Sequence, residues 1–269
     1  MAAFHEMVHP HGSYAEYANA FAYTTWHLPK HTTFEEAATI PLAGMTAALG
    51  MYQRLKLPVP WCPATQEIPL VVYGAASAVG AYAVKMAVLS NIHPLICVAG
   101  RGVPYVESLI DKSKGDTVID YREGDAAVVA GLQKALGGKK LLHAYDAVSE
   151  FGSYQNICKV LDHHQGKITN VLPGKKYKEI PATVERSTTQ VGNVHNKDSP
   201  LDVEFGAVFF KWFGRGLEKG FFRGHPHEVI PGGLGGVQQG LQNLKDGKAS
   251  ATKYVFRIAE TKGLDGAKL

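Results

Sequence analysis

Apolar and polar positions follow a repeating order through the middle of the chain. Short apolar runs of the kind that form buried strands alternate with segments whose small and apolar residues recur at helical spacing. The runs lie at 68–73, 94–99, 117–121, 141–148 and 167–172, and the helical segments at 78–89, 105–112, 126–136 and 151–161. Such alternation implies parallel strands joined by right-handed crossovers. The pattern therefore predicts an α/β fold, a doubly wound parallel-sheet Rossmann domain.

The segments on either side of this region have weaker patterns. Residues 34–55 favour a helix that is capped by Thr33 and broken or kinked at Pro41. Residues 12–30 resemble short strands. The remaining expected elements are a sixth strand within 183–195, helices at 204–219 and 234–245, and a final strand at 253–258.

Composition narrows the class of protein. The chain has 269 residues, of which 45% are hydrophobic and 19% charged, with a net charge of +4. This composition is typical of a globular protein, and it gives no argument for nucleic-acid binding. No apolar run reaches the ~18 residues that a membrane helix needs, and the N-terminus does not resemble a secretory signal. We therefore expect a cytoplasmic protein without a membrane segment.

Cysteine and histidine usage gives no indication of a metal site. Cys62, Cys97 and Cys158 lie far apart, so neither a disulfide framework nor a zinc ribbon is expected. The twelve histidines have no matching cluster of cysteines or carboxylates. The sequence therefore predicts that the protein holds no metal.

The most informative stretch joins the first strand to the first helix. It reads Val-Val-Tyr-Gly-Ala-Ala-Ser-Ala-Val-Gly over residues 71–80. Small residues let a backbone approach a pyrophosphate, whose charge the N–H groups at a helix start then bind. We expect Ser77, Ala78 and Val79 to hold that pyrophosphate. A tight turn without a ligand also needs small residues, but the surrounding strand–helix–strand unit favours the cofactor.

The end of the second strand reads Val98-Ala99-Gly100-Arg101-Gly102. An NAD-preferring site usually has an acidic residue here for the ribose hydroxyls. Arg101 can instead pair with a 2′-phosphate through a charge-assisted fork. The sequence predicts NADPH as the cofactor, in preference to NADH. The alternative is a surface arginine in a loop.

Several motifs together resemble the medium-chain dehydrogenase/reductase superfamily, in particular its zinc-independent quinone oxidoreductase and fungal enoyl-reductase-like branch. The turn at residues 74–80 resembles the AxxGxxG variant of that branch, and residues 11–17 resemble a late strand of its catalytic domain. The other motifs occur in the family's order: Ala37-Ala38-Thr39-Ile40-Pro41, Thr46-Ala47-Ala48-Leu49, Asp120-Tyr121, Tyr145-Asp146-Ala147-Val148, 168–173 and 247–255.

The resemblance implies roles for individual residues. Thr46 would lie beside the nicotinamide, with Phe209 and Lys253 approaching the same end of the cofactor. For Phe209, Tyr105 and Tyr121 the alternative is ordinary packing. Four residues would surround the adenosine and its 2′-phosphate: Gly100, Arg101, Tyr105 and Tyr121. Three others would pass near the nicotinamide ribose: Val171, Leu172 and Pro173. Thr46 and Phe209 are the nearest candidates for catalysis.

The resemblance also implies a domain organisation. Residues 1–40 would be the remnant of a GroES-like catalytic domain, residues 41–221 the NADP-binding Rossmann domain, and residues 222–269 the C-terminal part of the catalytic domain. The chain is expected to enter the catalytic domain near its end. Phe21, Trp26 and Phe256 would then lose neighbours and expose an apolar surface, which favours a homo-oligomer.

Two functions remain open at this point. One is an NADPH-dependent oxidoreductase that reduces a quinone or another conjugated carbonyl or enoyl acceptor by hydride transfer without a metal. The other is a catalytically impaired NADPH-binding protein, with RNA as one potential partner. The first implies a small conjugated carbonyl compound as substrate. No GxSxG motif is present, so hydrolase chemistry is not indicated.

Overall fold

The computed structural model describes residues 2–3 and 12–263, which form two compact units. Thr46–Val191 make one unit. The described residues up to Met45 and from Gly192 onward make the other. The expected domain boundaries at residues 40 and 221 stay a prediction.

The unit Thr46–Val191 is built on a six-stranded sheet whose neighbouring strands are all parallel. The strand order is β5-β4-β3-β6-β7-β8, the order of a doubly wound dinucleotide-binding sheet. The predicted fold class is therefore confirmed. The strands are β3 (Leu70–Tyr73), β4 (Leu95–Ala99), β5 (Thr117–Asp120), β6 (His143–Asp146), β7 (Lys167–Asn170) and β8 (Glu185–Thr188).

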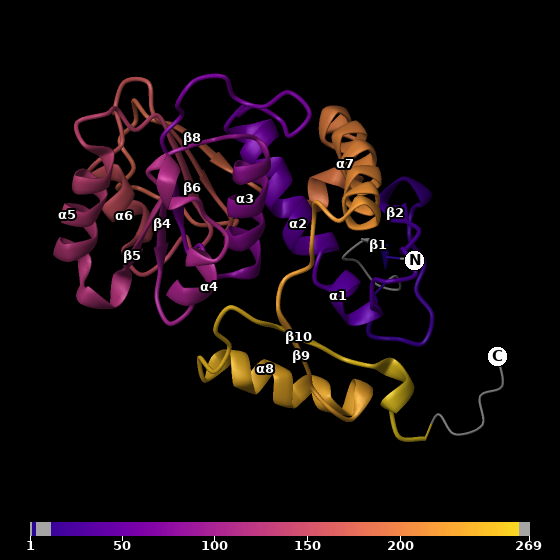
Figure 1. Cartoon of the computed structure of the whole chain (residues 1–269). Helices are drawn as coiled ribbons and strands as arrows, with labels where there is room; N and C mark the ends of the chain where they lie inside the picture. The colour runs from indigo at the N-terminus through magenta and orange to yellow at the C-terminus, as the bar shows by residue number, and fades with distance from the viewer. Residues whose placement is uncertain (1, 4–11, 264–269) are drawn as a thin grey trace. The chain divides into compact units, whose positions relative to one another are not determined.

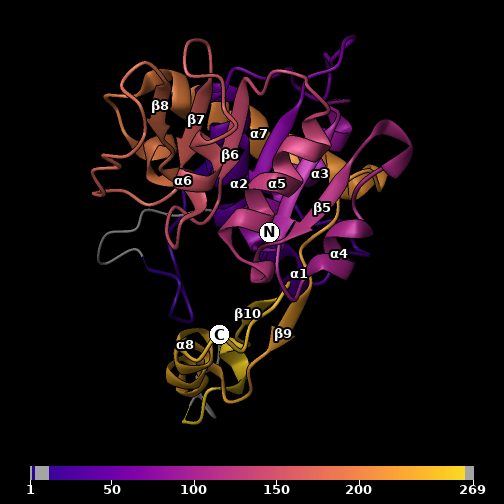
Figure 2. The same cartoon turned by 90° about the vertical axis from the view of Figure 1, so that its left-hand side faces the viewer.

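Helices cover both faces of this sheet, with α3 on one side and α5 and α6 on the other (Figures 1 and 2). Alternate strand residues such as Val71, Ile96 and Ile168 face α5 and α6 in one buried cluster. The central strands β3 and β4 are buried on both faces, which explains their continuous apolar runs. The helices are α3 (Ala78–Leu89), α4 (Val103–Glu107), α5 (Asp125–Leu136) and α6 (Ser153–Cys158).

The other unit has an aromatic core around the long helix α7 (Pro200–Lys219). Phe209, Phe210 and Phe213 are fully buried, and the Trp26 ring packs edge-on against Phe210 at 5.4 Å. The remaining elements are α1 (Phe34–Ala38), α8 (Val237–Lys245), the antiparallel pair β1 (Ala2–Ala3) and β2 (Thr25–Trp26), and the parallel pair β9 (His227–Val229) and β10 (Lys253–Val255).

Several local predictions are confirmed. Thr33 caps α1 by accepting a hydrogen bond from the Glu36 N–H at 3.1 Å. The helix predicted over 34–55 ends at Ala38 and a new one, α2 (Pro41–Ala48), begins at Pro41. This agrees with the preference of proline for the first helical position. A π-helix (Leu49–Arg54) continues α2.

Other local predictions are wrong. The helix expected at 105–112 ends at Glu107, because the Ser108 hydroxyl bonds back to the Tyr105 carbonyl and Asp111 starts a short 3₁₀ helix. Trp26 is only 5% exposed, since aromatic residues of α7 cover it. Residues 12–17 form no strand, and His11 lies outside the described residues. The N-terminal segment, which was expected not to be a secretory signal, also lies mostly outside them.

Candidate functional site

The carboxyl ends of the central strands β3 and β6 define the candidate site. These strands are neighbours, and the chain builds the sheet outward from them in opposite directions. Ligands of open α/β sheets bind outside the carboxyl ends of the strands at such a switch point. The turn predicted to bind a pyrophosphate follows β3 directly.

Two glycines allow this turn to form. Gly74 has φ +77°, a left-handed conformation that favours glycine. Gly80 lies against the turn so closely that a Cβ there would be 2.2 Å from the Gly74 carbonyl oxygen. An N–H···O bond from Ser77 to that same oxygen closes the turn at 2.9 Å. The last position of the motif is therefore a packing position.

The start of α3 presents hydrogen-bond donors at this edge. The Ser77 hydroxyl accepts a hydrogen bond from the Gly80 N–H at 3.1 Å. The N–H groups of Ala78 and Val79 have no acceptor within the described part of the chain. The first N–H groups of a helix carry partial positive charge and bind anions readily. This arrangement suits one phosphate of a dinucleotide.

The end of β4 forms a second part of the site. The Tyr121 ring packs over Gly100, where a Cβ would lie 2.6 Å from the ring carbon Cζ. Tyr121 nevertheless keeps 49% of its surface exposed, so its outer ring face can meet a ligand. Arg101 is exposed beside them. The structure thus brings three of the predicted adenosine contacts together.

The sequence analysis did not predict the ion pair between Asp120 and Arg122, which lies beside Tyr121. The Arg122 guanidinium donates to the Asp120 carboxylate, with Nε at 2.9 Å from Oδ1. These hydrogen bonds hold the pKa of Asp120 below its usual value. The Asp120 carboxylate at the end of β5 is thus paired with a cation and repels a phosphate less. The two residues are separated by one position, but sequence alone does not show that their side chains turn toward each other.

Asp146, at the end of β6, organises the loops at this edge. Its buried carboxylate accepts hydrogen bonds from the Val148 and Ser149 N–H groups, the Ser153 hydroxyl and the Asn170 amide. Burial raises the pKa of Asp146, and these donors oppose that effect. The sequence analysis noted Asp146 as part of a motif without giving it this role. The sequence signal that could have indicated this role is an aspartate at the end of an otherwise uncharged strand.

The segment after β7 is tied to the same network. The Val171 N–H donates to the Ser149 hydroxyl at 2.9 Å, and the Tyr177 hydroxyl donates to the Leu172 carbonyl at 2.7 Å. The Lys175 ammonium donates to the Ser149 carbonyl at 2.9 Å. Residues 171–173 are thereby held at the carboxyl edge, where the resemblance places the nicotinamide ribose.

Thr46 is anchored from the sheet. The Tyr145 hydroxyl donates to the Thr46 carbonyl at 2.9 Å, and the Tyr145 ring lies against Gly50, where a Cβ would be 2.3 Å away. Gly50 belongs to the π-helix that follows α2, a feature frequent at functional sites. Tyr145 was quoted only as part of a family motif in the sequence analysis. Its contact with Thr46 spans 99 positions, which no local pattern predicts.

Three candidates belong to the other unit or are largely packed within their own unit. Phe209 and Lys253 belong to the other unit, where Phe209 is fully buried and its ring centre is 4.4 Å from that of Phe205. Burial lowers the pKa of Lys253. Tyr105 is half-buried on α4, and burial raises its pKa to about 12. Their expected cofactor contacts stay predictions.

Two further properties concern the described residues only. They contain no group of three or more histidine, cysteine or carboxylate side chains that is able to hold a metal ion. Among the same residues, no helix combines the length and apolar character needed to cross a membrane.

Comparison with known proteins gives the family. The chain is 53% identical over 234 residues to trans-enoyl reductase fsr4 of Gibberella fujikuroi. This alignment covers 86% of this chain and 68% of that protein. It is 31% identical over 255 residues to trans-enoyl reductase ACTTS2 of Alternaria alternata, with 93% and 72% covered. No protein-family model matches the chain.

Solved structures agree with the fold. The CurK enoyl reductase superposes with a TM-score of 0.67 at 17% identity, over 87% of this chain and 66% of CurK. Mycobacterial Rv1454c, solved in complex with NADPH, superposes with a TM-score of 0.67 at 18% identity, over 89% of this chain and 71% of that chain. The chain thus spans slightly less than two thirds of CurK.

These findings define an oxidoreductase with the dinucleotide-binding fold of the medium-chain dehydrogenases/reductases. More narrowly, the chain belongs to the family of fungal trans-enoyl reductases. The predicted superfamily and its enoyl-reductase-like branch are confirmed.

Proposed function

We propose that this protein is an NADPH-dependent reductase of conjugated acceptors, with an enoyl group as the favoured acceptor. The observation that carries the proposal is the turn between β3 and α3. It places N–H donors without acceptors at the switch point of a doubly wound sheet. The relatives named trans-enoyl reductases support the enoyl acceptor over a quinone.

The residues at the carboxyl edge fit a dinucleotide. The N–H groups of Ala78 and Val79 would bind the pyrophosphate. Arg101 and Tyr121, beside Gly100, would bind the 2′-phosphate and the adenosine. The absence of a carboxylate after β4 favours NADPH over NADH, and the NADPH bound to Rv1454c agrees with this choice.

The nicotinamide end would lie between Thr46 and residues 171–173. Each is held by a hydrogen bond, Thr46 from the Tyr145 hydroxyl and Val171 to the Ser149 hydroxyl. Reduced nicotinamide supplies a hydride when it is bound. The role of these residues is to hold the ring in one orientation, because a misplacement of ~1 Å can cost about 100-fold in rate.

A conjugated acceptor is compatible with hydride transfer that uses no metal. An alkene or quinone conjugated with a carbonyl accepts hydride without a Lewis acid on its oxygen, whereas a saturated ketone gains more from one. We therefore propose an α,β-unsaturated acyl substrate and metal-free reduction. A proton for the neighbouring carbon comes from solvent or a nearby hydroxyl.

The cofactor assignment is tested by calorimetric titration of the protein with NADPH and NADH. Arg101→Ala should weaken NADPH binding by about 1.5–3 kcal/mol, the value of a hydrogen bond to a charged group, and leave NADH binding unchanged. Arg215→Ala, an exposed arginine of α7, serves as the matched control. Equal affinity of the wild-type protein for both cofactors, or equal loss of both in Arg101→Ala, would contradict the assignment.

The acceptor is tested by following NADPH oxidation with a 2-enoyl thioester, a benzoquinone and a saturated ketone. We expect the enoyl thioester to be reduced fastest and the ketone slowest. If NADPH binds but none of the three is reduced, the alternative of an NADPH-binding protein without reductase activity replaces this proposal.

A further inference from the structure

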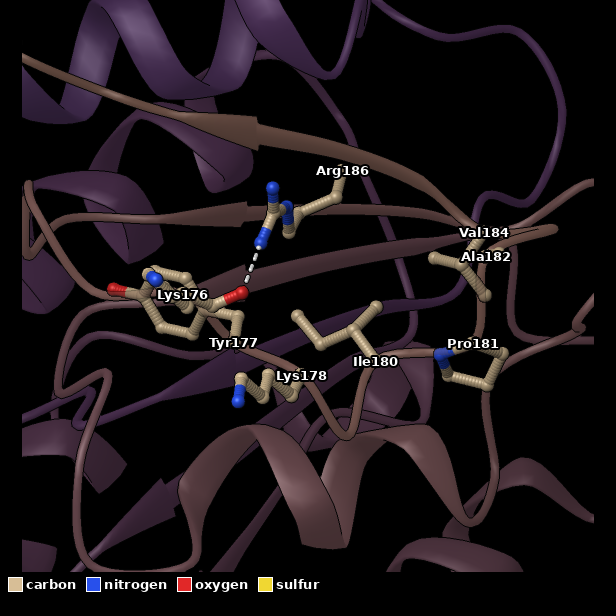
Figure 3. A pocket seen from close by; sticks show the side chains of 8 residues that line it. All are labelled: Lys176, Tyr177, Lys178, Ile180, Pro181, Ala182, Val184 and Arg186. Atoms are coloured by element: carbon tan, nitrogen blue, oxygen red, sulfur yellow. Dashed lines mark hydrogen bonds between the residues drawn. The ribbon is translucent and has the colours of Figure 1, made fainter.

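The loop between β7 and β8 forms a pocket whose lining includes no residue of the turn after β3. It has a volume of ≈390 Å³ and is lined by Lys176, Tyr177, Lys178, Ile180, Pro181, Ala182, Val184 and Arg186. Small-molecule pockets commonly have ~300–1,000 Å³. Figure 3 shows the three basic residues and Tyr177 toward one end and the four apolar residues toward the other.

The pocket lies at the edge of the sheet, on the face that α6 covers. Arg186 is the register partner of Ile168 on β7, and paired residues of neighbouring strands point to the same face. Ile168 belongs to the buried cluster that contains Ile157 of α6. The aliphatic wall, Ile180 and Val184, joins that cluster. The apolar end is therefore built on the core of the unit.

Tyr177 forms a fixed wall at the basic end of the pocket. It is 3% exposed and has φ +43°, a conformation that bulky residues rarely adopt. Its hydroxyl bonds to the Leu172 carbonyl, and its ring meets Tyr154 edge-on at 5.2 Å. Such strained residues persist only where their surroundings hold them, and they cluster at ligand clamps. This observation is independent of the charge of the pocket.

The basic end has cationic groups available for a ligand. Within the described residues, the side-chain ammonium groups of Lys176 and Lys178 make no hydrogen bond or ion pair. Arg186 uses one N–H for the Lys176 carbonyl at 2.9 Å, and its guanidinium lies 5.6 Å from the centre of the Tyr177 ring. The neighbouring acid Glu185 pairs with Lys167 at 2.9 Å.

A second neighbouring acid is also engaged. Glu179 accepts a hydrogen bond from the Tyr154 hydroxyl at 2.9 Å. The Glu179 carboxylate also attracts the Lys178 ammonium of the pocket lining. The lining holds three cations, Lys176, Lys178 and Arg186, against this one acid, so the basic end keeps a net positive charge.

We propose that this pocket binds a small organic anion with an apolar body, a short-chain or medium-chain carboxylate. The carboxylate would lie between Lys176, Lys178 and Arg186, and the hydrocarbon against Ile180, Pro181 and Val184. Charge-assisted hydrogen bonds fix the head group, and removal of the chain from water adds affinity. The site needs neither the cofactor nor the proposed reductase activity.

The probe is octanoate, titrated into the full chain by calorimetry without nucleotide. We expect saturable binding of one octanoate per chain, tighter than about 1 mM. Octanol lacks the charge and inorganic phosphate lacks the hydrocarbon, so each should bind at least about tenfold more weakly. Absence of saturable octanoate binding, or equal binding of octanol or phosphate, overturns the proposal.

Variants locate the binding. Lys178→Gln and Arg186→Gln should each weaken octanoate binding about tenfold or more, whereas Lys134→Gln, an exposed lysine of α5, should leave it unchanged. Arg186 supports the loop through the Lys176 carbonyl, so thermal unfolding checks that its variant folds. Lys178 has no such bond and gives the cleaner test. Unchanged octanoate affinity in Lys178→Gln with a folded protein would refute the assignment of the site.

Discussion

Replacing Gly80 by alanine tests the packing of the turn after β3. A Cβ at this position would lie 2.2 Å from the Gly74 carbonyl oxygen and 2.9 Å from the Ala75 Cα. Both contacts are with backbone atoms, so α3 and the turn must move apart. Overpacking of this kind typically costs about 1–3 kcal/mol of unfolding free energy. At about 2–4 °C per kcal/mol, Tm should fall by roughly 2–12 °C.

The same displacement should weaken cofactor binding. The N–H groups of Ala78 and Val79 lie in the first turn of α3 and move with it. Loss of one hydrogen bond to a charged phosphate costs about 1.5–3 kcal/mol, or roughly 10-fold to 150-fold in Kd. Unfolding is followed by circular dichroism and NADPH binding by calorimetry below the lowered Tm.

The matched control is Gly235→Ala, because a Cβ at Gly235 meets no atom within 4 Å. This variant should keep both Tm and NADPH affinity. If Gly80→Ala has the same Tm and the same Kd for NADPH as the wild-type protein, the close approach of α3 to the turn does not limit this site and the reasoning fails.

Two further predictions concern the sheet. Tyr145→Phe removes the hydrogen bond that the Tyr145 hydroxyl donates to the Thr46 carbonyl. The variant should lower the unfolding free energy by about 0.5–1.5 kcal/mol in urea titrations, whereas Tyr17→Phe on the exposed surface should change it little. Equal effects of the two variants would contradict the anchoring role of Tyr145. Burial lowers the pKa of His143 from 6.5, so below that pH the unfolded chain takes up a proton that the folded chain excludes. Stability should therefore decrease as pH falls from 6.5, by at most about 1.4 kcal/mol per pH unit from this residue, and His143→Gln should decrease less; identical pH profiles would exclude the effect.

Much of this fold could be predicted from the sequence, because each strand and helix start is determined by residues that are neighbours in the chain. Continuous apolar runs mark strands buried on both faces, and Ser77 before the small residues of α3 marks a helix start. Thr33 and Pro41 likewise act on their own neighbours. The helix at 105–112 failed because hydrogen bonds of Ser108 and Asp111 compete with helix continuation.

The remainder of the site depends on contacts between distant parts of the chain. Asp146 reaches Asn170, and Tyr145 reaches Thr46, across separations of 24 and 99 residues. Trp26 was expected to lose neighbours, but helix α7 covers it from more than 180 residues away in the sequence. Tyr177 adopts a left-handed conformation that its residue type argues against. Such features follow from tertiary packing and leave no periodic signal.

The edge strand β8 has a consequence for the behaviour of newly made chains. A strand at the border of a sheet exposes unpaired backbone groups that another strand can extend, and natural proteins prevent this with charged side chains. β8 carries Glu185 and Arg186, both exposed, at this border. Replacing both by valine would leave a flat apolar edge, so the yield of soluble protein during synthesis would decrease even where the finished fold is retained.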